Sequence, residues 1–226
     1  MTEIDIRKSG RVGRITLQRP PALTALTRGM VDDLAAALPA LAADDDVAML
    51  VIDAEGDKAF CAGGDIAGIY KAMVEGDYDV PRDFWRAEYP LNAALFNFPK
   101  PVAAFMQGFT MGGGVGIGCH ASHRIVGAGS RIAMPECGIG LIPDIGGSLL
   151  LARAPGRLGE YMGTTGYRMG PGDAIFAGFA DYYLPEDAWP SLIAELEETG
   201  DWERIDRAAQ TCPPASIEAE IADIEN

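Results

Sequence analysis

Two carboxylates stand eight residues apart in a segment that is otherwise apolar and rich in glycine and proline. The segment reads MPECGIGLIPDIGG and contains Glu136 and Asp144. Acidic side chains among Ile, Leu, Met and Pro are expected to be partly desolvated, which raises their pKa and suits acid–base chemistry near neutrality. Alternatively, Asp144 caps a helix that starts near Gly147, whereas Glu136 caps no obvious helix.

Two glycine motifs follow buried apolar runs and open helical segments. The first, AFCAGGDI, contains Gly64, and the second, GFTMGGGVGIG, contains Gly112 and Gly113. Glycine inside a helix costs about 1 kcal/mol relative to alanine, so these glycines need a reason. One reason is close packing of a helix on a sheet. The other is that backbone N–H groups at a helix start are offered to a ligand oxygen.

Other catalytic and cofactor motifs are absent from the sequence. A dinucleotide-binding GxGxxG fails in every register of the second motif, and neither GxxxxGK[ST] nor GxSxG occurs. The two histidines, His120 and His123, have no carboxylate at ligand spacing on the same helix, so we expect them to bind no metal. The sequence therefore predicts chemistry without a metal ion or a redox cofactor.

The net charge of −15 over 226 residues makes nucleic acid and anionic membranes poor partners. Any polyphosphate ligand must then be held by local cations and backbone N–H groups. The first ten residues lack a signal-peptide pattern, and no apolar run approaches the roughly 20 residues of a membrane span. The four cysteines lack CxxC spacing and are expected to be reduced. We therefore expect a cytoplasmic protein that does not bind membranes.

The hydrophobic pattern predicts an α/β arrangement. Alternating residues predict a hairpin over 3–18, and continuous apolar runs predict strands buried on both faces at 48–53, 102–105 and 123–126. The helical patterns between and before them lie at 27–38, 65–75, 82–98 and from 113 onward. Strands that alternate with helices indicate a largely parallel sheet. Beyond 146 we expect mostly helix, with a short strand near 180–184 and helices at 186–198, 201–210 and within 213–226.

The three motifs, in this order and at this spacing, resemble the crotonase (enoyl-CoA hydratase/isomerase) superfamily. The match runs from about Ile4 to Leu184. The resemblance implies a crotonase-like spiral of ββα units with a helical C-terminal portion. It implies an acyl-CoA-binding catalytic core over 1–184 and a helical segment over 185–226, shorter than is usual among the hydrolases of the superfamily. It also implies a homo-oligomer of trimer or hexamer type.

The resemblance further implies an acyl-CoA thioester as substrate, with coenzyme A as part of that substrate and no other cofactor. The thioester carbonyl would lie between the N–H groups of Gly64 and Gly113, which form an oxyanion hole. Arg19 and Lys58, which flank the glycine motifs, are the candidates for the CoA phosphates. The substrate-binding positions implied are Glu88, Ala22, Ala62, Asp65, Ile66 and Gly112.

Hydratases of the superfamily usually carry a catalytic glutamate at the position of Gly116, so a two-glutamate hydratase mechanism is disfavoured. The pattern F-x-R-x-E-Y-x-L-N at 84–92, with Glu136 and Asp144, resembles the 3-hydroxyisobutyryl-CoA hydrolases, a subgroup of valine catabolism. We therefore predict hydrolysis of a short 3-hydroxyacyl-CoA, with Glu136 and Asp144 as the catalytic pair and Glu88 holding the substrate hydroxyl. The alternatives are an enoyl-CoA isomerase or hydratase, and a non-catalytic acyl-CoA-binding module.

Overall fold

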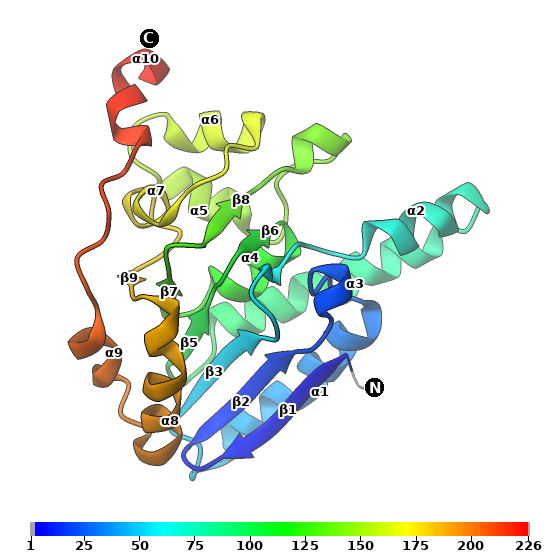
Figure 1. Ribbon diagram of the computed structural model, residues 1–226. Coiled ribbons are helices and arrows are strands. Elements are labelled where there is room, and N and C mark those ends of the chain that lie inside the picture. Colours follow the sequence, from blue (N-terminus) through cyan, green and yellow to red (C-terminus); the bar gives the residue numbers. More distant parts are fainter. Residues whose placement is uncertain (1–2, 226) are drawn as a thin grey trace.

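The computed structural model describes residues 3–225. The ends of the predicted core (1–184) and of the predicted helical segment (185–226), namely Met1, Thr2 and Asn226, therefore lie outside the described residues. The chain forms two sheets (Figure 1). The larger sheet has the order β1-β2-β3-β5-β7-β9, and only β1 and β2 pair in antiparallel fashion. Its strands are β1 Ile4–Ser9, β2 Val12–Leu17, β3 Met49–Ala54, β5 Val102–Phe105, β7 His123–Val126 and β9 Tyr182–Tyr183.

The smaller sheet is parallel and has the order β4-β6-β8. Its three-residue strands are β4 Ala59–Cys61, β6 Phe109–Met111 and β8 Arg131–Ala133. Each follows a strand of the larger sheet along the chain, so β3–β4–α2, β5–β6–α4 and β7–β8 are successive turns of one spiral. The predicted hairpin and the strands of the larger sheet are confirmed, whereas the smaller sheet was not predicted.

Helices fill the connections between strands and the C-terminal third of the chain. The first four are α1 Arg28–Ala43, α2 Ile66–Val74, α3 Asp79–Phe96 and α4 Gly113–Gly118. The later ones are α5 Gly147–Arg153, α6 Leu158–Thr165, α7 Pro171–Phe176, α8 Trp189–Thr199, α9 Glu203–Ala208 and α10 Ile221–Glu225. Short 3-10 turns occupy η1 Pro20–Ala22, η2 Glu136–Ile139, η3 Glu186–Ala188 and η4 Ile217–Glu220. No helix within residues 3–225 combines the length and apolar character needed to cross a membrane.

Helix α1 starts as the sequence predicts and ends later. Thr27 is its N-cap, and the Thr27 hydroxyl accepts a hydrogen bond from the N–H of Met30. The helix then runs through Pro39 to Ala43, although the prediction ended it before that proline. The apolar face that includes Leu34 and Leu38 is buried, so tertiary packing outweighs the hydrogen bond that Pro39 cannot donate.

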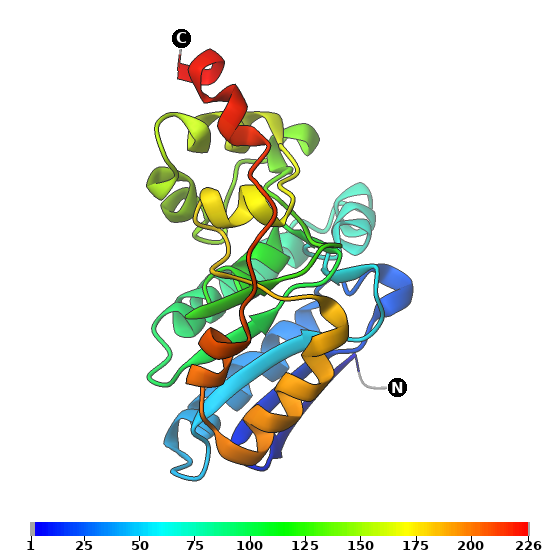
Figure 2. The ribbon, with the colours of Figure 1, turned by 60° about the vertical axis from the view of Figure 1, so that its left-hand side comes forward.

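The larger sheet is buried on both faces, which explains its continuous apolar strands. Helix α8 lies along one face and α1 along the other (Figure 2). Since successive side chains of a strand point to opposite faces, Met49 and Val51 pack in a cluster with Trp189 of α8. Leu50 and Ile52 point the other way, into the main core.

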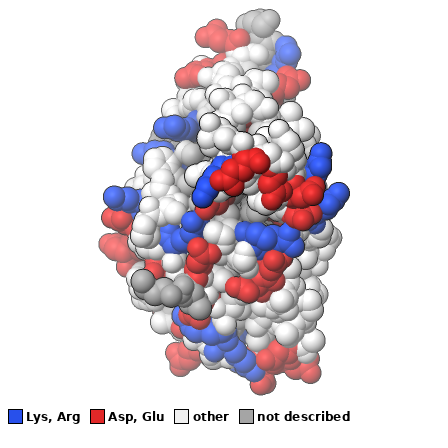
Figure 3. Space-filling model, turned by 90° about the vertical axis from the view of Figure 1, so that its right-hand side faces the viewer, with Lys and Arg blue, Asp and Glu red and all other residues white. Residues whose placement is uncertain are grey.

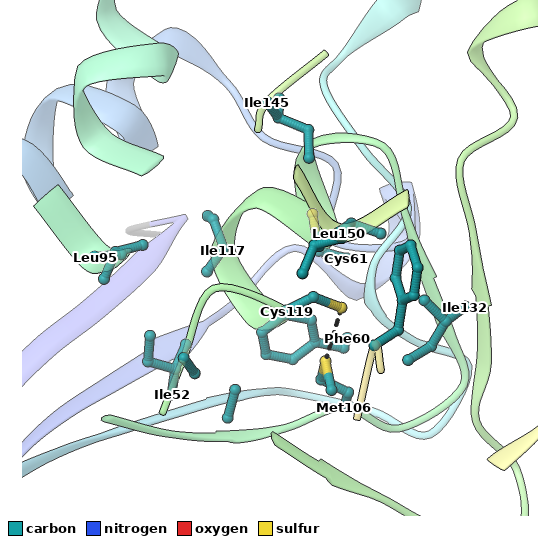
Figure 4. Close-up of a cluster of buried hydrophobic side chains, with 14 of the residues drawn as sticks. Ile52, Phe60, Cys61, Leu95, Met106, Ile117, Cys119, Ile132, Ile145 and Leu150 are labelled. Carbon is teal, nitrogen blue, oxygen red and sulfur yellow. Dashed lines mark hydrogen bonds between the residues drawn. The ribbon is translucent and has the colours of Figure 1, made fainter. Parts of the chain in front are cut away.

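The main core continues into the space between the two sheets and holds α4 in place (Figure 4). Cys61, Ile117 and Cys119 meet there, and all three are buried. A Cβ atom on Gly114 would lie 2.1 Å from the carbonyl oxygen of Cys61, so only glycine allows α4 to lie this close to β4. Close packing therefore explains part of the second glycine motif. Cys61 and Cys119 are buried without a disulfide partner, whereas Cys137 is exposed and Cys212 is partly buried.

Candidate active site

One cavity brings most of the predicted site residues together. It lies where the end of β4, the start of α4, helix α3 and the segment after β8 meet. Phe84, Trp85 and Ile145 contribute apolar walls. The predicted residues that line it are Ala62, Gly64, Ile66, Glu88, Gly112, Gly113, Glu136 and Asp144. The cavity thus combines backbone N–H groups, three carboxyl groups and an apolar lining.

The amides of Gly64 and Gly113 are neighbours at the wall of this cavity. A Cβ atom on Gly113 would lie 3.3 Å from the nitrogen of Gly64. Gly113 begins α4, where the first N–H groups have no acceptor within the helix. Gly112 precedes it with φ +50° and ψ −121°, a backbone conformation that favours glycine. Among residues 3–225 neither N–H has a backbone acceptor, so both donors are available to a ligand.

Glu136 is buried in the cavity wall and only partly hydrogen-bonded. It begins the 3-10 turn η2, and its side chain is 5% exposed. A Cβ atom on Gly112 would lie 2.9 Å from Oε1 of Glu136, and Oε2 has no hydrogen-bond partner among the described residues. Burial, together with the nearby charge of Asp144, raises the pKa of Glu136 to about 7. This carboxyl can therefore gain or lose a proton at neutral pH.

Glu88 occupies an apolar stripe of α3. Phe84, Glu88, Leu91 and Leu95 recur at helical spacing and are all buried, so the fold of α3 forces this carboxyl inward. Its Oε1 lacks a partner among the described residues, and a Cβ atom on Gly113 would lie 2.5 Å from it. Burial first, and then the charges of Asp144 and Glu136, raise the pKa of Glu88 to about 8. At neutral pH the group is a hydrogen-bond donor.

Asp144 reaches the cavity from a strained loop. The Tyr89 hydroxyl donates a hydrogen bond of 2.8 Å to its Oδ2, and burial with this contact raises the pKa of Tyr89. The next residue, Ile145, has φ +50°, which is strained for a β-branched residue. The alternative that Asp144 caps α5 is wrong, because Gly146 is the N-cap and no side chain caps that helix.

Four predicted residues do not line the cavity. Ala22 lies in η1, and Asp65 is the N-cap of α2, where its side chain accepts a hydrogen bond from Gly68. Arg19 is engaged by Asp65 at 2.8 Å and by Glu3 at 2.9 Å. Lys58 is exposed. On the face shown in Figure 3, groups of Lys and Arg stand beside Asp and Glu, so no separate cationic patch gathers there.

Asn92 and Tyr89 were not predicted as site residues. Asn92 lies one helical turn after Glu88 and packs against Gly116 of α4. A Cβ atom on Gly116 would lie 2.8 Å from Oδ1 and 2.9 Å from Nδ2 of Asn92. The i, i+4 spacing of Glu88 and Asn92 was available in the sequence and places both on one face of a helix. The position where hydratases carry a glutamate is therefore filled by an amide from another helix.

The chain belongs to the crotonase superfamily. The family model described as "Enoyl-CoA hydratase/isomerase" matches residues 12–225. The match begins at β2 and covers the rest of the larger sheet, the smaller sheet, every motif of the cavity and the C-terminal helices. The spiral of ββα turns agrees with this family, so the predicted fold class is confirmed.

Several curated relatives are named as 3-hydroxyisobutyryl-CoA hydrolases. The chain is 39% identical to "3-hydroxyisobutyryl-CoA hydrolase, mitochondrial" of Xenopus tropicalis over 218 residues, which is 96% of this chain and 54% of that protein. It is 34% identical over 199 residues to "Probable 3-hydroxyisobutyryl-CoA hydrolase 3" of Arabidopsis thaliana, covering 88% of this chain and 52% of that protein. The chain thus spans about half the length of these curated relatives.

Solved structures with the same fold carry other names. An enoyl-CoA hydratase from Rhodobacter sphaeroides 2.4.1 superposes with a TM-score of 0.93 at 54% identity, over 99% of this chain and 65% of that one. A carnitinyl-CoA dehydratase from Mycobacterium thermoresistibile superposes with a TM-score of 0.94 at 39% identity and the same coverage. The names of these relatives all refer to CoA esters.

The comparisons correct the expected location. The vertebrate relatives are named as mitochondrial proteins, and the expectation of a cytoplasmic location is therefore wrong. That expectation rested on the lack of a secretory signal pattern in the first ten residues, on the lack of a membrane span and on cysteines expected to be reduced.

Proposed function

We propose that this protein hydrolyses the thioester of a short 3-hydroxyacyl-CoA, of the 3-hydroxyisobutyryl-CoA type. One observation carries the proposal. The buried carboxyl groups of Glu88 and Glu136 each have an unpartnered oxygen, and they lie close to Gly113 and Gly112 at the start of α4. Position 116, by contrast, is a glycine and has no carboxylate. The names of the curated relatives support the same reaction.

The amides of Gly64 and Gly113 would bind the thioester carbonyl oxygen. Attack of water on the carbonyl carbon moves negative charge onto that oxygen, and two N–H donors aimed at it stabilise the charge. Removing one donor of this kind typically lowers the rate by about 10²–10³-fold. Because both are backbone groups at glycine positions, they stay in place without a side chain that could rotate away.

Glu136 would accept the proton of the attacking water. A bond forms between the water oxygen and the thioester carbon, and the proton moves to Glu136. When the carbon–sulfur bond then breaks, CoA leaves as a thiolate and takes the proton from Glu136, which restores the carboxylate. A pKa of about 7 suits a group that first accepts and then releases a proton at neutral pH.

Glu88 and Asp144 would position the reactants. With its pKa raised to about 8, Glu88 is protonated at neutral pH and can donate a hydrogen bond to the substrate hydroxyl. Asp144 is oriented by the Tyr89 hydroxyl and can accept a hydrogen bond from the attacking water. In this mechanism Glu136 accepts and returns the proton, Glu88 binds the substrate hydroxyl, and Asp144 orients the attacking water.

A thiol-release assay tests the proposal. The protein is incubated with 3-hydroxyisobutyryl-CoA and with other short 3-hydroxyacyl-CoA esters, and free thiol is followed over time. An enoyl-CoA ester is tested in parallel for migration or hydration of its double bond. The proposal expects thiol from the hydroxyacyl esters, and no release from any of them would refute it.

Hydration or isomerisation of an enoyl-CoA is the second candidate, because a structural neighbour at 54% identity is called an enoyl-CoA hydratase. In that case Glu136 alone would carry the proton. The parallel assay separates the two, since hydration and isomerisation change the double bond and leave the thioester intact. Binding of CoA esters without any turnover would instead indicate a non-catalytic module.

A further inference from the structure

A series of buried polar atoms leads away from the active-site cavity along α3. Oε1 of Glu88, both amide atoms of Asn92 and Nδ1 of His120 have no hydrogen-bond partner among the described residues. All three side chains are more than nine-tenths buried. Glu88 and Asn92 lie one turn apart on α3, over Gly113 and Gly116 of α4. The unpartnered atoms of Glu88 and Asn92 thus lie along the contact between α3 and α4, and His120 follows the end of α4, where its ring contacts Phe96 of α3.

A second cavity begins where this series ends. It has a volume of about 210 Å³, and Asn92, His120, Ile145 and Tyr89 are among its lining residues. Ile145 lines the active-site cavity as well, and Tyr89 bonds to Asp144 there. Other lining residues, such as Phe96 and Leu149, are exposed, so this second cavity also meets the surface. The turn of α3 that carries Glu88 and Asn92 therefore separates the two cavities: Glu88 lines the active-site cavity and Asn92 lines the second one.

The chemistry of the unpartnered atoms indicates what they bind. His120 Nε2 lies 2.7 Å from the carbonyl oxygen of Ile145, to which it can only donate. Burial lowers the pKa of His120, so the ring is neutral and Nδ1 is a bare acceptor. Asn92 offers one acceptor and two donors. A small molecule that both donates and accepts hydrogen bonds satisfies all of these groups, and water is the smallest such molecule.

We propose that the cavity between Asn92, His120 and Tyr89 binds water and passes it along Asn92 and Glu88 to the thioester, as a back entrance to the active site. The inference rests on the proposed hydrolysis. In the proposed reaction the CoA ester would occupy the active-site cavity, so the attacking water would need another way in. A glutamate at position 116 would collide with the Asn92 amide, and glycine there keeps this path open.

Three variants test the water path. Asn92→Leu keeps the approximate size of the side chain and removes its polar atoms, whereas Asn92→Ser keeps a polar group and leaves room for a water molecule. We expect Asn92→Leu to lower the single-turnover rate of thiol release by about 10-fold, the equivalent of one lost water-mediated hydrogen bond. We expect Asn92→Ser to stay within about 3-fold of the wild type. The Kd of a non-hydrolysable thioether analogue of the CoA ester should not change in either variant.

Thr110→Val is the matched control. The Thr110 hydroxyl is also buried and unpartnered among the described residues, but it lies in β6 and lines neither cavity. This variant should release thiol at the wild-type rate. Wild-type turnover in Asn92→Leu, or an equal loss in Asn92→Leu and Asn92→Ser, would overturn the proposal. Thermal unfolding of each variant separates these outcomes from a failure to fold.

A crystal structure of the unmodified protein tests the water site without any assay. We expect ordered water bridging the Asn92 amide to Nδ1 of His120 and to the Glu88 carboxyl, and its loss in Asn92→Leu. A dry cavity at a resolution that shows other buried waters would overturn the inference. If instead the waters are present and no hydroxyacyl ester releases thiol, the proposed hydrolysis fails and the water site stands.

Discussion

Two parts of this molecule bury carboxyl groups in opposite ways. Asp173, in α7, is 4% exposed and accepts hydrogen bonds from the Ser216 hydroxyl, from the N–H of Ile217 at 2.9 Å, and from Gly170 and Tyr167 at 3.3 Å. Glu88 and Glu136 are equally buried, yet each has an oxygen without a partner among the described residues. A buried carboxyl surrounded by donors holds two segments together, whereas one without donors is left free to bind a ligand or move a proton.

This difference between the two kinds of carboxyl predicts that Glu136→Gln gives the largest loss in the rate of thiol release. Glutamine keeps the shape of the side chain but cannot accept and return a proton, and general acid–base groups typically contribute about 10²–10⁴-fold to a rate. Thiol release should fall by that factor, while the Kd for the CoA thioether analogue stays the same. Turnover at the wild-type rate would remove Glu136 from the mechanism.

Asp173→Ala should instead reduce stability and leave turnover per folded molecule unchanged. The substitution leaves the buried N–H of Ile217 and the exposed hydroxyl of Ser216 without their acceptor, and we expect the free energy of unfolding to fall by about 1–3 kcal/mol, mostly from the buried N–H. Denaturant titration measures this, with exposed Asp187→Ala as a control. A loss of turnover in fully folded Asp173→Ala would contradict the distinction between the two kinds of carboxyl.

The pH dependence of thiol release should be bell-shaped. The rate should rise as Glu136 loses its proton at about pH 7 and fall as Glu88 loses its own at about pH 8. In Glu88→Gln the amide still donates a hydrogen bond and cannot ionise, so the alkaline limb should disappear. If Glu88→Gln keeps the wild-type alkaline limb, another group causes it.

Glu88 should also affect stability as a function of pH. Its pKa in the folded protein is raised from the ordinary value of 4.5 to about 8, so between these values the folded state binds more protons than the unfolded state. This contribution is fully present below pH 4.5 and is lost as the pH rises to about 8. Glu88→Gln should therefore gain stability relative to the wild type across this window, as denaturant titrations at several pH values would measure.

Tyr89→Phe should have the smallest effect. It removes one partly exposed hydrogen bond to Asp144, which is worth about 1 kcal/mol, so we expect a loss of several-fold in thiol release and little change in stability. A loss as large as that of Glu136→Gln would mean that Asp144, rather than Glu136, handles the proton.

Much of the larger sheet could be predicted because local pattern determines it. The apolar runs at β3, β5 and β7 reflect burial on two faces, and Thr27 is a recognisable helix cap. The strands β4, β6 and β8 have only three residues each, too few to show a period, and their pairing is with strands distant in sequence. The smaller sheet could therefore not be predicted from local pattern.

The candidate site could be predicted where backbone and motif determine it, and not where tertiary contacts do. The motifs that contain Gly64, Gly113 and Glu136 meet in one cavity, as the resemblance implied. Arg19 was expected to be available for phosphate, but Glu3 and Asp65 reach it from other parts of the chain. The Asn92 contact with Gly116 depends on how α3 crosses α4, which neither helix specifies alone.

A crystal structure with a bound thioether analogue of a 3-hydroxyacyl-CoA, in which the carbonyl oxygen is retained, tests the central claim most directly. We predict that this oxygen lies about 2.7–3.1 Å from the nitrogens of both Gly64 and Gly113. The Glu136 carboxyl should face the carbonyl carbon. A carbonyl bound elsewhere, or held by only one of the two amides, would contradict the account.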